Sequence, residues 1–393
     1  MSAETIESVE LEIERIAAGG AGVARLPDGM VSFIAGALPG ERVTARIDER
    51  AKRFANGTTI NVLAASDARV TPECSAVAAG CGGCDWAHID PATQPAFKAQ
   101  VVRDTIERVA GLEAPEILTG PELPAAGYRT TLRAGVLNGR AGYRRRASHE
   151  LVLPELCHVA HPDAAEILSA GRFPRAEEVT IRISTSGGGR IVVCDPSLEG
   201  TSVPNDVIVV EGGADAWIRQ EVLGYTFQVS ADSFFQSSVV GAEALVETVR
   251  GFAGDNIGTL VDLYAGVGLF AALIPARSRF LVESNPTAVA DARVNLDGLE
   301  KTKILRRRVE EWEPVRANVV VADPSRVGLG PNGVGSVLAT QADRVILVSC
   351  DIGPMGRDLR LLAEGGYSLS AVTLVDMFPN TSRIEAVSLL TRS

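Results

Sequence analysis

Cys350 is the residue of this chain whose setting best suits covalent chemistry. It follows the apolar segment Arg344–Ser349, which is predicted to be a buried strand, so its thiol would lie at the carboxyl end of that strand. The residues after it, a Gly-Pro-Met-Gly stretch and then residues 357–359, resemble the start of a helix. A thiol near the N-terminus of a helix has a lowered pKa and more thiolate character. The alternative for Cys350 is a buried, inert cysteine.

Two carboxylates occupy comparable places. Asp323, in the sequence Ala-Asp-Pro-Ser-Arg, follows the predicted strand 318–322, and Glu385 enters the predicted strand 384–390. Burying a carboxylate at the start of an apolar strand costs free energy unless it has a partner or a role. A cysteine with a carboxylate close by can act as a nucleophile with a base. The alternative for Glu385 is a structural ion pair.

The segment 261–270 predicts a site for an adenosine-containing ligand. It is an apolar strand that runs into a turn with Gly266 and Gly268 and then into a helix. Glycines there let a ligand approach the backbone, and Glu283 at the end of the next strand can accept hydrogen bonds from ribose hydroxyls. The third glycine of the dinucleotide fingerprint is absent, and S-adenosylmethionine fits the pattern better than NAD. A tight turn without a ligand is the alternative.

A group of cysteines lies in the first half of the chain. Cys74, Cys81 and Cys84 belong to one Gly-rich loop, and Cys157 follows later. Clustered cysteines in a cytoplasmic protein indicate metal binding or catalysis before disulfides. Four thiolates suit a [4Fe-4S] cluster or, as the alternative, a structural zinc ion. Cys194, inside an apolar strand, is predicted to be a core residue.

The pattern of the whole chain predicts an α/β protein of three parts that position these groups. Residues 1–65 read as short strands between Gly turns, which predicts a small β-barrel. Residues 66–229 read mostly as strands, apart from a helix over 95–113 whose apolar face could pack on the third part. Residues 230–393 alternate strands and helices, which predicts a parallel sheet covered on both faces. The last two strands are expected to pair antiparallel at its edge.

The net charge of −11 argues against a nucleic-acid partner at long range, but local patches decide contact. Arginine-rich clusters at 42–53, 140–146 and 306–308 permit RNA binding without requiring it. No apolar run is long enough to span a bilayer, and the N-terminus has no signal-peptide pattern. We therefore expect a cytoplasmic protein with neither a membrane partner nor an obligate protein partner.

At these residues the chain resembles the RNA uracil-5-methyltransferases, which form 5-methyluridine in tRNA and 23S rRNA. The likeness covers nearly the whole length: the barrel resembles the TRAM RNA-binding domain, and the third part a Rossmann-like S-adenosylmethionine methyltransferase domain. The resemblance implies that RNA is the partner, that Cys350 is the nucleophile and that Glu385 is the base. Besides the glycine turn, it implies a cofactor site lined by Gln236, Tyr264, Leu269, Glu283 and Asp323. It also implies a mainly β central domain with a [4Fe-4S] cluster on Cys74, Cys81, Cys84 and Cys157.

The chemistry explains why such an enzyme needs these groups. Carbon 5 of uracil is a poor nucleophile, but a thiolate that adds to carbon 6 turns the ring into an enolate whose carbon 5 attacks the methyl group. A base then removes the proton from carbon 5, so that the thiolate can leave. Two other classes stay open: an RNA cytosine-5 methyltransferase, which also uses a cysteine on carbon 6, and a non-catalytic RNA-binding or redox iron–sulfur protein.

A uracil in folded RNA is stacked or paired, so the enzyme would act on a loop or flip the base into a pocket. The arginine clusters would contact phosphates. Tyr143, Trp86 and Phe235 are candidates for stacking on a base, although each is more typical of a packing residue.

Five positions depart from the family pattern. The family usually has Asp-Pro-Pro-Arg in the first motif, Asn-Pro after the nucleophile, and histidines before the base. This chain has Ser325 in place of the second proline of Asp-Pro-Pro-Arg, and Asp351 and Ile352 in place of Asn-Pro after Cys350. Before Glu385 it has Asn380 and Arg383 in place of histidines. These changes bear on the surroundings of the substrate base and on the choice of RNA more than on the reaction type.

Overall fold

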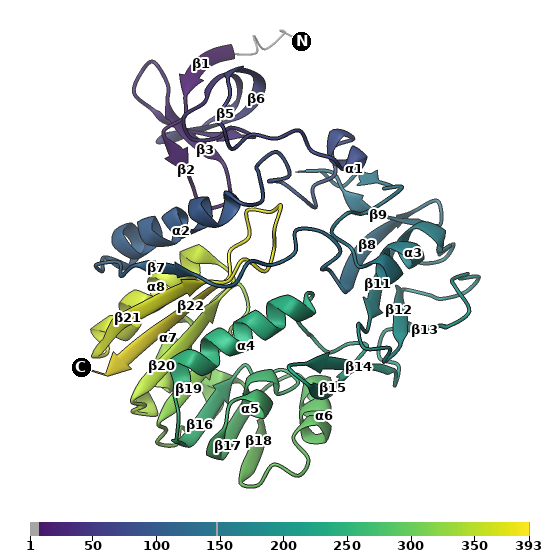
Figure 1. Ribbon diagram of the computed structural model, residues 1–393, viewed down its shortest axis with the longest axis vertical. Helices are drawn as coiled ribbons and strands as arrows, with labels where there is room; N and C mark the ends of the chain where they lie inside the picture. The colour runs from purple at the N-terminus through teal and green to yellow at the C-terminus, as the bar shows by residue number, and fades with distance from the viewer. Residues whose placement is uncertain (1–7, 147, 393) are drawn as a thin grey trace.

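The computed structural model describes residues 8–146 and 148–392, which form three packed units built on four β-sheets (Figure 1). An N-terminal barrel-like unit and a central β unit lie beside a larger α/β unit, formed mostly by the second half of the chain. The mixed α/β class predicted from the sequence is confirmed. No helix in the described residues is long and apolar enough to cross a membrane.

The first unit is a six-stranded sheet with the order β1-β5-β6-β4-β3-β2. Side chains of β4 point alternately inward and outward, because successive residues of a strand face opposite sides. Arg69 donates from Nε to Oε1 of the buried Glu41 over 2.5 Å, which ties the unit to the linker after β6. Its strands are β1 (Ser8–Glu12), β2 (Arg15–Ile16), β3 (Gly22–Arg25), β4 (Val31–Ala35), β5 (Arg42–Arg50) and β6 (Phe54–Ala64).

The central unit is a sheet with the order β10-β9-β8-β11-β12-β13, in which only the β12–β13 pair is parallel among the described residues. Helix α3 (Pro162–Ala170) packs its apolar side on this sheet, and Cys194 is fully buried in the shared core, as predicted. The short helix α1 (Ser75–Ala78) belongs to the cysteine loop. The strands are β8 (Thr131–Leu137), β9 (Arg140–Arg144), β10 (Leu151–Val152), β11 (Glu178–Ile183), β12 (Arg190–Asp195) and β13 (Val207–Glu211).

The third unit is an eight-stranded sheet with the order β18-β17-β16-β19-β20-β22-β21-β7. Its parallel strands are β16 (Ile257–Leu263), β17 (Ala276–Glu283), β18 (Thr302–Arg306), β19 (Val319–Ala322) and β20 (Arg344–Ser349). As predicted, the last two strands, β21 (Tyr367–Leu374) and β22 (Ala386–Arg392), pair antiparallel. β22 also pairs antiparallel with β20.

Among the described residues of the second half of the chain, one α-helix precedes the parallel strands and four follow strands of this sheet, and a two-stranded hairpin packs beside them. The helices are α4 (Val239–Ala253), α5 (Leu269–Leu273), α6 (Pro286–Asn295), α7 (Gly330–Ala339) and α8 (Ile352–Glu364). The hairpin of β14 (Trp217–Val222) and β15 (Tyr225–Ser230) shares an apolar core with α4. The central strands β19 and β20 are buried on both faces and read as nearly continuous apolar runs, and the carboxyl ends of the parallel strands meet at one edge.

A segment from the first half of the chain completes this sheet. Helix α2 (Gln94–Thr105) continues into a π-helical turn, Ile106–Ala110, and strand β7 (Ile117–Thr119) then pairs in parallel with β21. In Figure 1, α2 and β7 lie beside α8 and β21. The helix predicted over 95–113 packs its apolar face on the α/β unit, as the sequence had allowed. The edge strand of the sheet is β7, not β21 as predicted.

Candidate active site

A cavity of about 800 Å³ opens at the carboxyl ends of the parallel strands. In an open α/β sheet, this is the edge where loops from successive strands meet and ligands bind. Of the residues singled out from the sequence, the cavity lining includes Gln236, Tyr264, Gly266, Glu283, Asp323, Cys350 and Glu385.

The turn after β16 is shaped around the carboxylate of Glu283. Gly266 has a φ of +54°, and its N–H donates to Oε2 of Glu283 over 2.9 Å. Oε1 accepts the N–H of Asn285 over 2.6 Å, so the carboxylate is held at the end of β17. The space in front of Gly266 is open, because a Cβ built there would have no atom within 4 Å.

Gly268 and Leu269 lie next to this turn but outside the cavity lining. Gly268 has a φ of +90°, and a Cβ built on it would stand 2.4 Å from the side chain of Leu296. Leu269 is buried as the first residue of α5. Gly268 and Leu269 therefore hold the turn in place by packing and do not line the cavity themselves.

The loop that ends in Gln236 is fixed by a buried carboxylate on α6. Asp291 has no exposed surface and accepts hydrogen bonds from the N–H and hydroxyl of Ser230 and from the hydroxyl of Ser233. Gln228 donates to the same carboxylate from its side chain over 3.1 Å. This anchor holds the start of the loop, and Gln236 lies in the cavity wall with 8% of its surface exposed.

Asp323 and Glu385 form an acidic pair in a part of the cavity with little access to water. Burial raises the pKa of Asp323 to about 7. Burial and the charge of Asp323 raise the pKa of Glu385 well above its usual range. Because like charges in a buried site disfavour each other, we expect at most one of the two groups to be ionised at neutral pH without a nearby cation.

The thiol of Cys350 does not have the lowered pKa that its place before a helix indicated. Burial, followed by the charges of Glu385 and Asp323, raises its pKa to about 11, against a smaller lowering by Arg326. Helix α8 does begin after this cysteine, but Asp351 caps it and accepts the N–H of the second helical residue over 3.1 Å. That carboxylate offsets the positive end of the helix. Cys350 is therefore a thiol that needs help to ionise.

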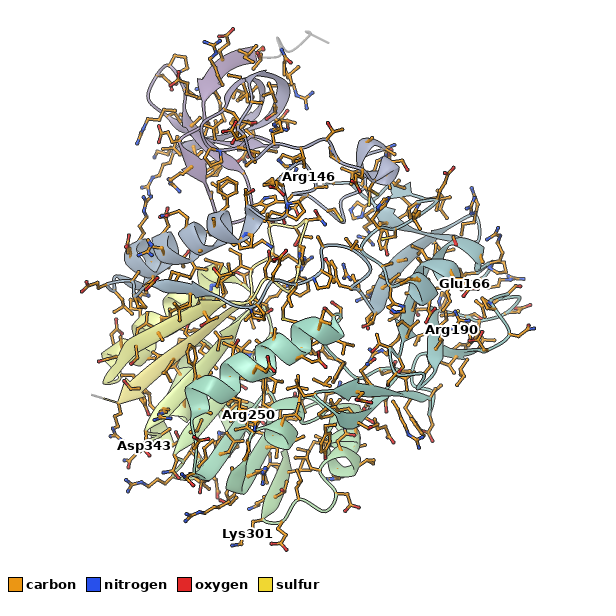
Figure 2. The ribbon with its side chains drawn as sticks, in the orientation of Figure 1. Arg146, Glu166, Arg190, Arg250, Lys301 and Asp343 are labelled. Carbon is orange, nitrogen blue, oxygen red and sulfur yellow. The ribbon has the colours of Figure 1, made fainter. Side chains whose placement is uncertain are left out.

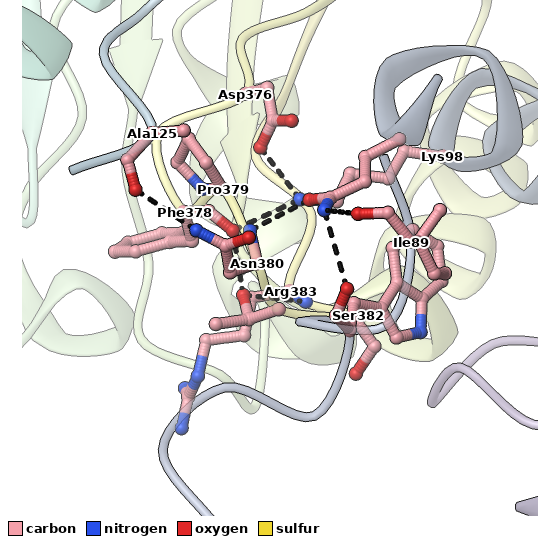
Figure 3. Close-up of polar contacts among 12 residues, drawn as sticks. Ile89, Lys98, Ala125, Asp376, Phe378, Pro379, Asn380, Ser382 and Arg383 are labelled. Atoms are coloured by element: carbon pink, nitrogen blue, oxygen red, sulfur yellow. Dashed lines mark hydrogen bonds and ion pairs between the residues drawn. The ribbon is translucent and has the colours of Figure 1, made fainter. Parts of the chain in front are cut away.

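The loop between β21 and β22, which leads to Glu385, is held by a buried ion pair (Figure 3). Lys98 on α2 has no exposed surface, and its ammonium group donates to Oδ1 of Asp376 over 2.6 Å and to the carbonyl oxygen of Phe378 over 3.1 Å. Burial lowers the pKa of Lys98, while Asp376 raises it. Such a charge is tolerated inside a protein only when it is paired and hydrogen-bonded.

Asn380 and Ser382 join the same loop to the segment that follows the cysteine loop. The side-chain amide of Asn380 donates to the carbonyl of Ala125 over 2.9 Å. The backbone carbonyl of Asn380 accepts the N–H of Trp86 over 2.9 Å. The N–H of Ser382 donates to Oδ1 of Asp85 over 3.0 Å. The loop that leads to the base and the segment next to the cysteines therefore form one hydrogen-bonded unit.

The N-terminal unit touches this loop through Gly20. A Cβ on Gly20, whose φ is +85°, would stand 2.4 Å from Nε1 of Trp86 and 2.5 Å from Cβ of Ser382. Nε1 of Trp86 donates to the carbonyl of Gly20 over 3.3 Å. Only a glycine permits this approach, and all three units meet here.

The departures from the family pattern surround the same region. Ser325 and Arg383 line the cavity of about 800 Å³, which we call the cofactor cavity after the ligand that we propose for it. Asp351 and Ile352 line the cavity next to it. Asn380 anchors the loop as described above.

Cys74, Cys81, Cys84 and Cys157 line a separate cavity of about 400 Å³. Burial, with smaller effects of the neighbouring thiols, raises the pKa of Cys84 to about 12 and also raises the pKa of Cys81. The structure brings the four cysteines to one cavity, but among the described residues no three His, Cys, Asp or Glu side chains are grouped so that they could hold a metal ion. A formed metal site is thus not supported. None of the four lies within a helix or a strand, so the ladders do not set their spacing.

Sequence reasoning missed two apolar residues at the mouth of the cofactor cavity. Phe234 is 71% exposed and Val327 is 73% exposed, and both line the cavity. An exposed aromatic ring there is available to stack on a planar ligand. The stacking candidates Trp86 and Phe235 are instead buried. Strand alternation alone could not distinguish two adjacent phenylalanines in a loop.

Three comparisons bear on identity. Residues 4–60 match the TRAM domain model. The chain is 33% identical to an RNA methyltransferase of Streptomyces avermitilis, with 98% of each chain covered, and 32% identical to one of Corynebacterium glutamicum, with 98% and 97% covered. The tRNA (uracil-54, C5)-methyltransferase of Pyrococcus abyssi, solved with S-adenosyl-L-homocysteine, has a TM-score of 0.75 over 98% of this chain and 100% of its own. At 20% identity, that last likeness shows the fold.

The Rossmann-like sheet and the TRAM domain give this chain the fold of the Pyrococcus abyssi enzyme. The full-length relatives decide the family. The chain belongs to the RNA methyltransferases.

Proposed function

We propose that this RNA methyltransferase transfers a methyl group from S-adenosylmethionine to carbon 5 of a uracil and so forms 5-methyluridine. The observation that carries the proposal is the single cavity shared by the Cys350 thiol, the Glu385 carboxyl group and the glycine turn with Glu283. A nucleophile, a base and a cofactor site are the set that this reaction requires. The Pyrococcus abyssi enzyme, named for uracil carbon 5, has the same fold.

The residues of the cavity fit S-adenosylmethionine, which supplies an electrophilic methyl group when bound. The open space in front of Gly266 admits a ligand against the backbone. Glu283 uses its carboxylate on two backbone N–H groups and keeps capacity to accept ribose hydroxyls. Gln236, Tyr264 and Asp323 complete the proposed site from three further segments.

Cys350 and Glu385 would act on the base in sequence. Cys350 would give its proton to solvent water, with the charge of Arg326 favouring the thiolate, and a bond would form between sulfur and carbon 6. The displaced π electrons would move to oxygen 4, and carbon 5 of this enolate would take the methyl group as the methyl–sulfur bond breaks, whose electrons remain on sulfur in the departing S-adenosylhomocysteine. Glu385 then takes the carbon 5 proton; the electrons of that bond restore the ring double bond and expel the thiolate. A raised pKa suits a carboxylate that must take a proton from carbon.

Tritium release from RNA carrying 5-tritiated uridine tests this proposal. The RNA should come from cells that lack the enzyme, and Cys350→Ser should be assayed in parallel. We expect release by the native protein only when S-adenosylmethionine is present, and none by the variant. Methyl incorporation without tritium release would move the target to another atom, with cytosine carbon 5 the first to examine. If neither occurs, the reading as a non-catalytic RNA-binding protein gains support.

The RNA substrate is proposed to be tRNA or 23S rRNA. The TRAM domain, which resembles an RNA-binding module, lies beside the catalytic loop through Gly20. Running the tritium assay on purified tRNA and on purified rRNA separates the two, and the fraction that releases tritium identifies the substrate.

The four-cysteine cavity is proposed to hold a [4Fe-4S] cluster, with a structural zinc ion as the alternative. Four thiols around one cavity match the donor set of either group, and the raised pKa values of Cys81 and Cys84 mean that a positive centre is needed to hold these two as thiolates. Iron, sulfide and zinc contents of protein purified without oxygen test this. Zinc without iron would select the alternative, and neither metal would refute both.

A further inference from the structure

A second polar cavity, of about 580 Å³, adjoins the cofactor cavity on the side of Cys350. It lies where the three units meet, since Gly19 of the barrel, Gly82 of the cysteine loop and Asp351 at the sheet edge all line it. Figure 2 places Arg146, another lining residue, between the barrel and the central unit. Six arginines line this cavity, which are Arg129, Arg144, Arg145, Arg146, Arg326 and Arg383.

The acidic residues in this lining do not balance the arginines. Among the described residues the lining holds two carboxylates, those of Asp85 and Asp351. Asp85 accepts the N–H of Ser382, and Asp351 caps helix α8. Both carboxylates are thus already used by the backbone, and the cavity has an excess of positive charge.

Arg326 and Arg383 line both cavities, and their guanidinium groups, like that of Arg146, are uncompensated among the described residues. Within 8–146 and 148–392, none of these three groups has a hydrogen-bond or ion-pair partner, and in Figure 3 the Arg383 side chain extends away from the contacts that hold its loop. Burial, together with the like charges of Arg326 and Arg129, lowers the pKa of Arg383. Arg190 shows the ordinary arrangement, because it pairs with Glu166 on the outer side of the central unit (Figure 2). Like charges that lie close together without partners favour a bound anion.

The position of these arginines indicates which anion. Arg326, Cys350 and Arg383 line both cavities, so they form the boundary between the cofactor and the arginine-lined space. A nucleotide whose base enters the first cavity to meet Cys350 must leave its sugar and phosphates at this boundary. The planar fork of arginine matches phosphate oxygens in pairs.

We infer that Arg129, Arg326 and Arg383 bind the RNA phosphates next to the nucleotide that is methylated, and that Arg144 to Arg146 continue this path toward the barrel. The inference rests on the proposed function, in that an RNA base enters the cofactor cavity. Arg383 stands where the family usually has a histidine. A permanent cation there holds a phosphate at any physiological pH, whereas a histidine changes its charge within that range.

The test is the salt dependence of binding of a single-stranded oligouridylate by the native protein, Arg383→Gln, Arg326→Gln and Arg383→Lys. Each phosphate contact on a single strand contributes about 0.7 to the slope of log affinity against log salt. We expect each Gln variant to lose about tenfold or more in affinity and about 0.7 in slope. Arg383→Lys should keep the slope, because it keeps the charge. Arg250→Gln is the matched control, since Arg250 is exposed in the last turn of α4 and lines neither cavity (Figure 2).

A second measurement separates phosphate from the carboxylate of the cofactor. In Arg383→Gln the affinity for RNA should fall by a larger factor than the affinity for S-adenosylmethionine; a loss of cofactor affinity with an unchanged RNA slope would overturn the inference. Salt-independent binding by the native protein, or equal slopes in native protein and both Gln variants, would also overturn it. Arg129→Gln replaces any variant whose melting curve shows that it is unfolded. Normal slopes without tritium release would refute the uracil proposal alone.

Discussion

The cofactor cavity and the cysteine cavity differ in what holds their walls. The first is built at the ends of β16, β17, β19 and β20, whose spacing is set by ladder hydrogen bonds. The second has its cysteines outside helices and strands, and no three described side chains of the metal-binding types are grouped to hold a metal ion. The comparison teaches that a site on strand ends keeps its geometry by itself, whereas a site on turns depends on what it binds.

The largest expected effect lies in the sheet-edge cavity. Glu385→Gln should lower the rates of tritium release and of turnover by about 10²- to 10⁴-fold, because the proton on carbon 5 loses its acceptor after the methyl group has been transferred. The adduct of Cys350 with RNA should then accumulate, visible as a protein–RNA band that survives denaturation. Iron or zinc content should not change, since the cysteine cavity is separate. A native rate in this variant would remove Glu385 from the reaction.

The ion pair of Lys98 and Asp376, which holds the loop before Glu385, tests how much the wall of the cofactor cavity contributes to stability. Lys98→Met leaves Asp376 buried without its partner and should cost about 3–5 kcal/mol of the free energy of unfolding in urea. Arg15→Gln is the control, since its partner Asp104 is only part-buried, and should cost less than about 1 kcal/mol. Equal losses in the two variants would mean that the buried pair has no special part.

Cys84→Ser examines the cysteine cavity directly. We expect it to lose the bound metal and to lower the apparent stability by about 2–3 kcal/mol, the value for a ligand present at about a hundred times its Kd. Cys194→Ser, in the apolar core of the central unit, should keep the metal. Metal content by elemental analysis and thermal melting measure the two effects. Equal metal in both variants would contradict the proposed role of Cys84.

The smallest expected effect is a pH dependence of cofactor binding. The pKa of Asp323 is raised to about 7, so its carboxyl group is mostly protonated below that pH and ionised above it. The ionised form attracts the positive sulfonium of S-adenosylmethionine. Affinity should therefore rise by less than about tenfold from about pH 6 to about pH 8. S-adenosylhomocysteine, which lacks that charge, and Asp323→Asn should both show a flatter profile in calorimetry.

The same contrast governs what the sequence could predict. Apolar runs that end in glycine, carboxylate or cysteine imply a parallel sheet, and its topology then brings Gly266, Glu283, Asp323 and Cys350 to one edge. The pairing of the last two strands also followed from the missing helix between them. Local patterns were sufficient here because the ladders convert strand position into spatial position.

Other features depend on partners that are distant in the sequence. Lys98 and Asp376 are 278 residues apart, and the sequence around either residue does not predict that they form an ion pair. The raised pKa of Cys350 arises from burial and then from the charges of Glu385 and Asp323, which come from two other loops, so the local helix signal gave the wrong direction. The spacing of the four cysteines in the sequence does not predict how far apart their side chains lie, because that distance depends on how separate turns approach each other.

The pairing of the short strand β7 with β21 determines when the catalytic sheet can be completed during synthesis and folding. β7 pairs with β21, so a strand translated early must wait for one translated near the end before the sheet acquires its last edge. A shortened protein that begins at residue 230 would leave β21 as an open edge, prone to join other chains, and would uncover the apolar face that α2 covers. The methyltransferase unit is therefore not a separable module, and the whole chain must be synthesised before its catalytic sheet is complete.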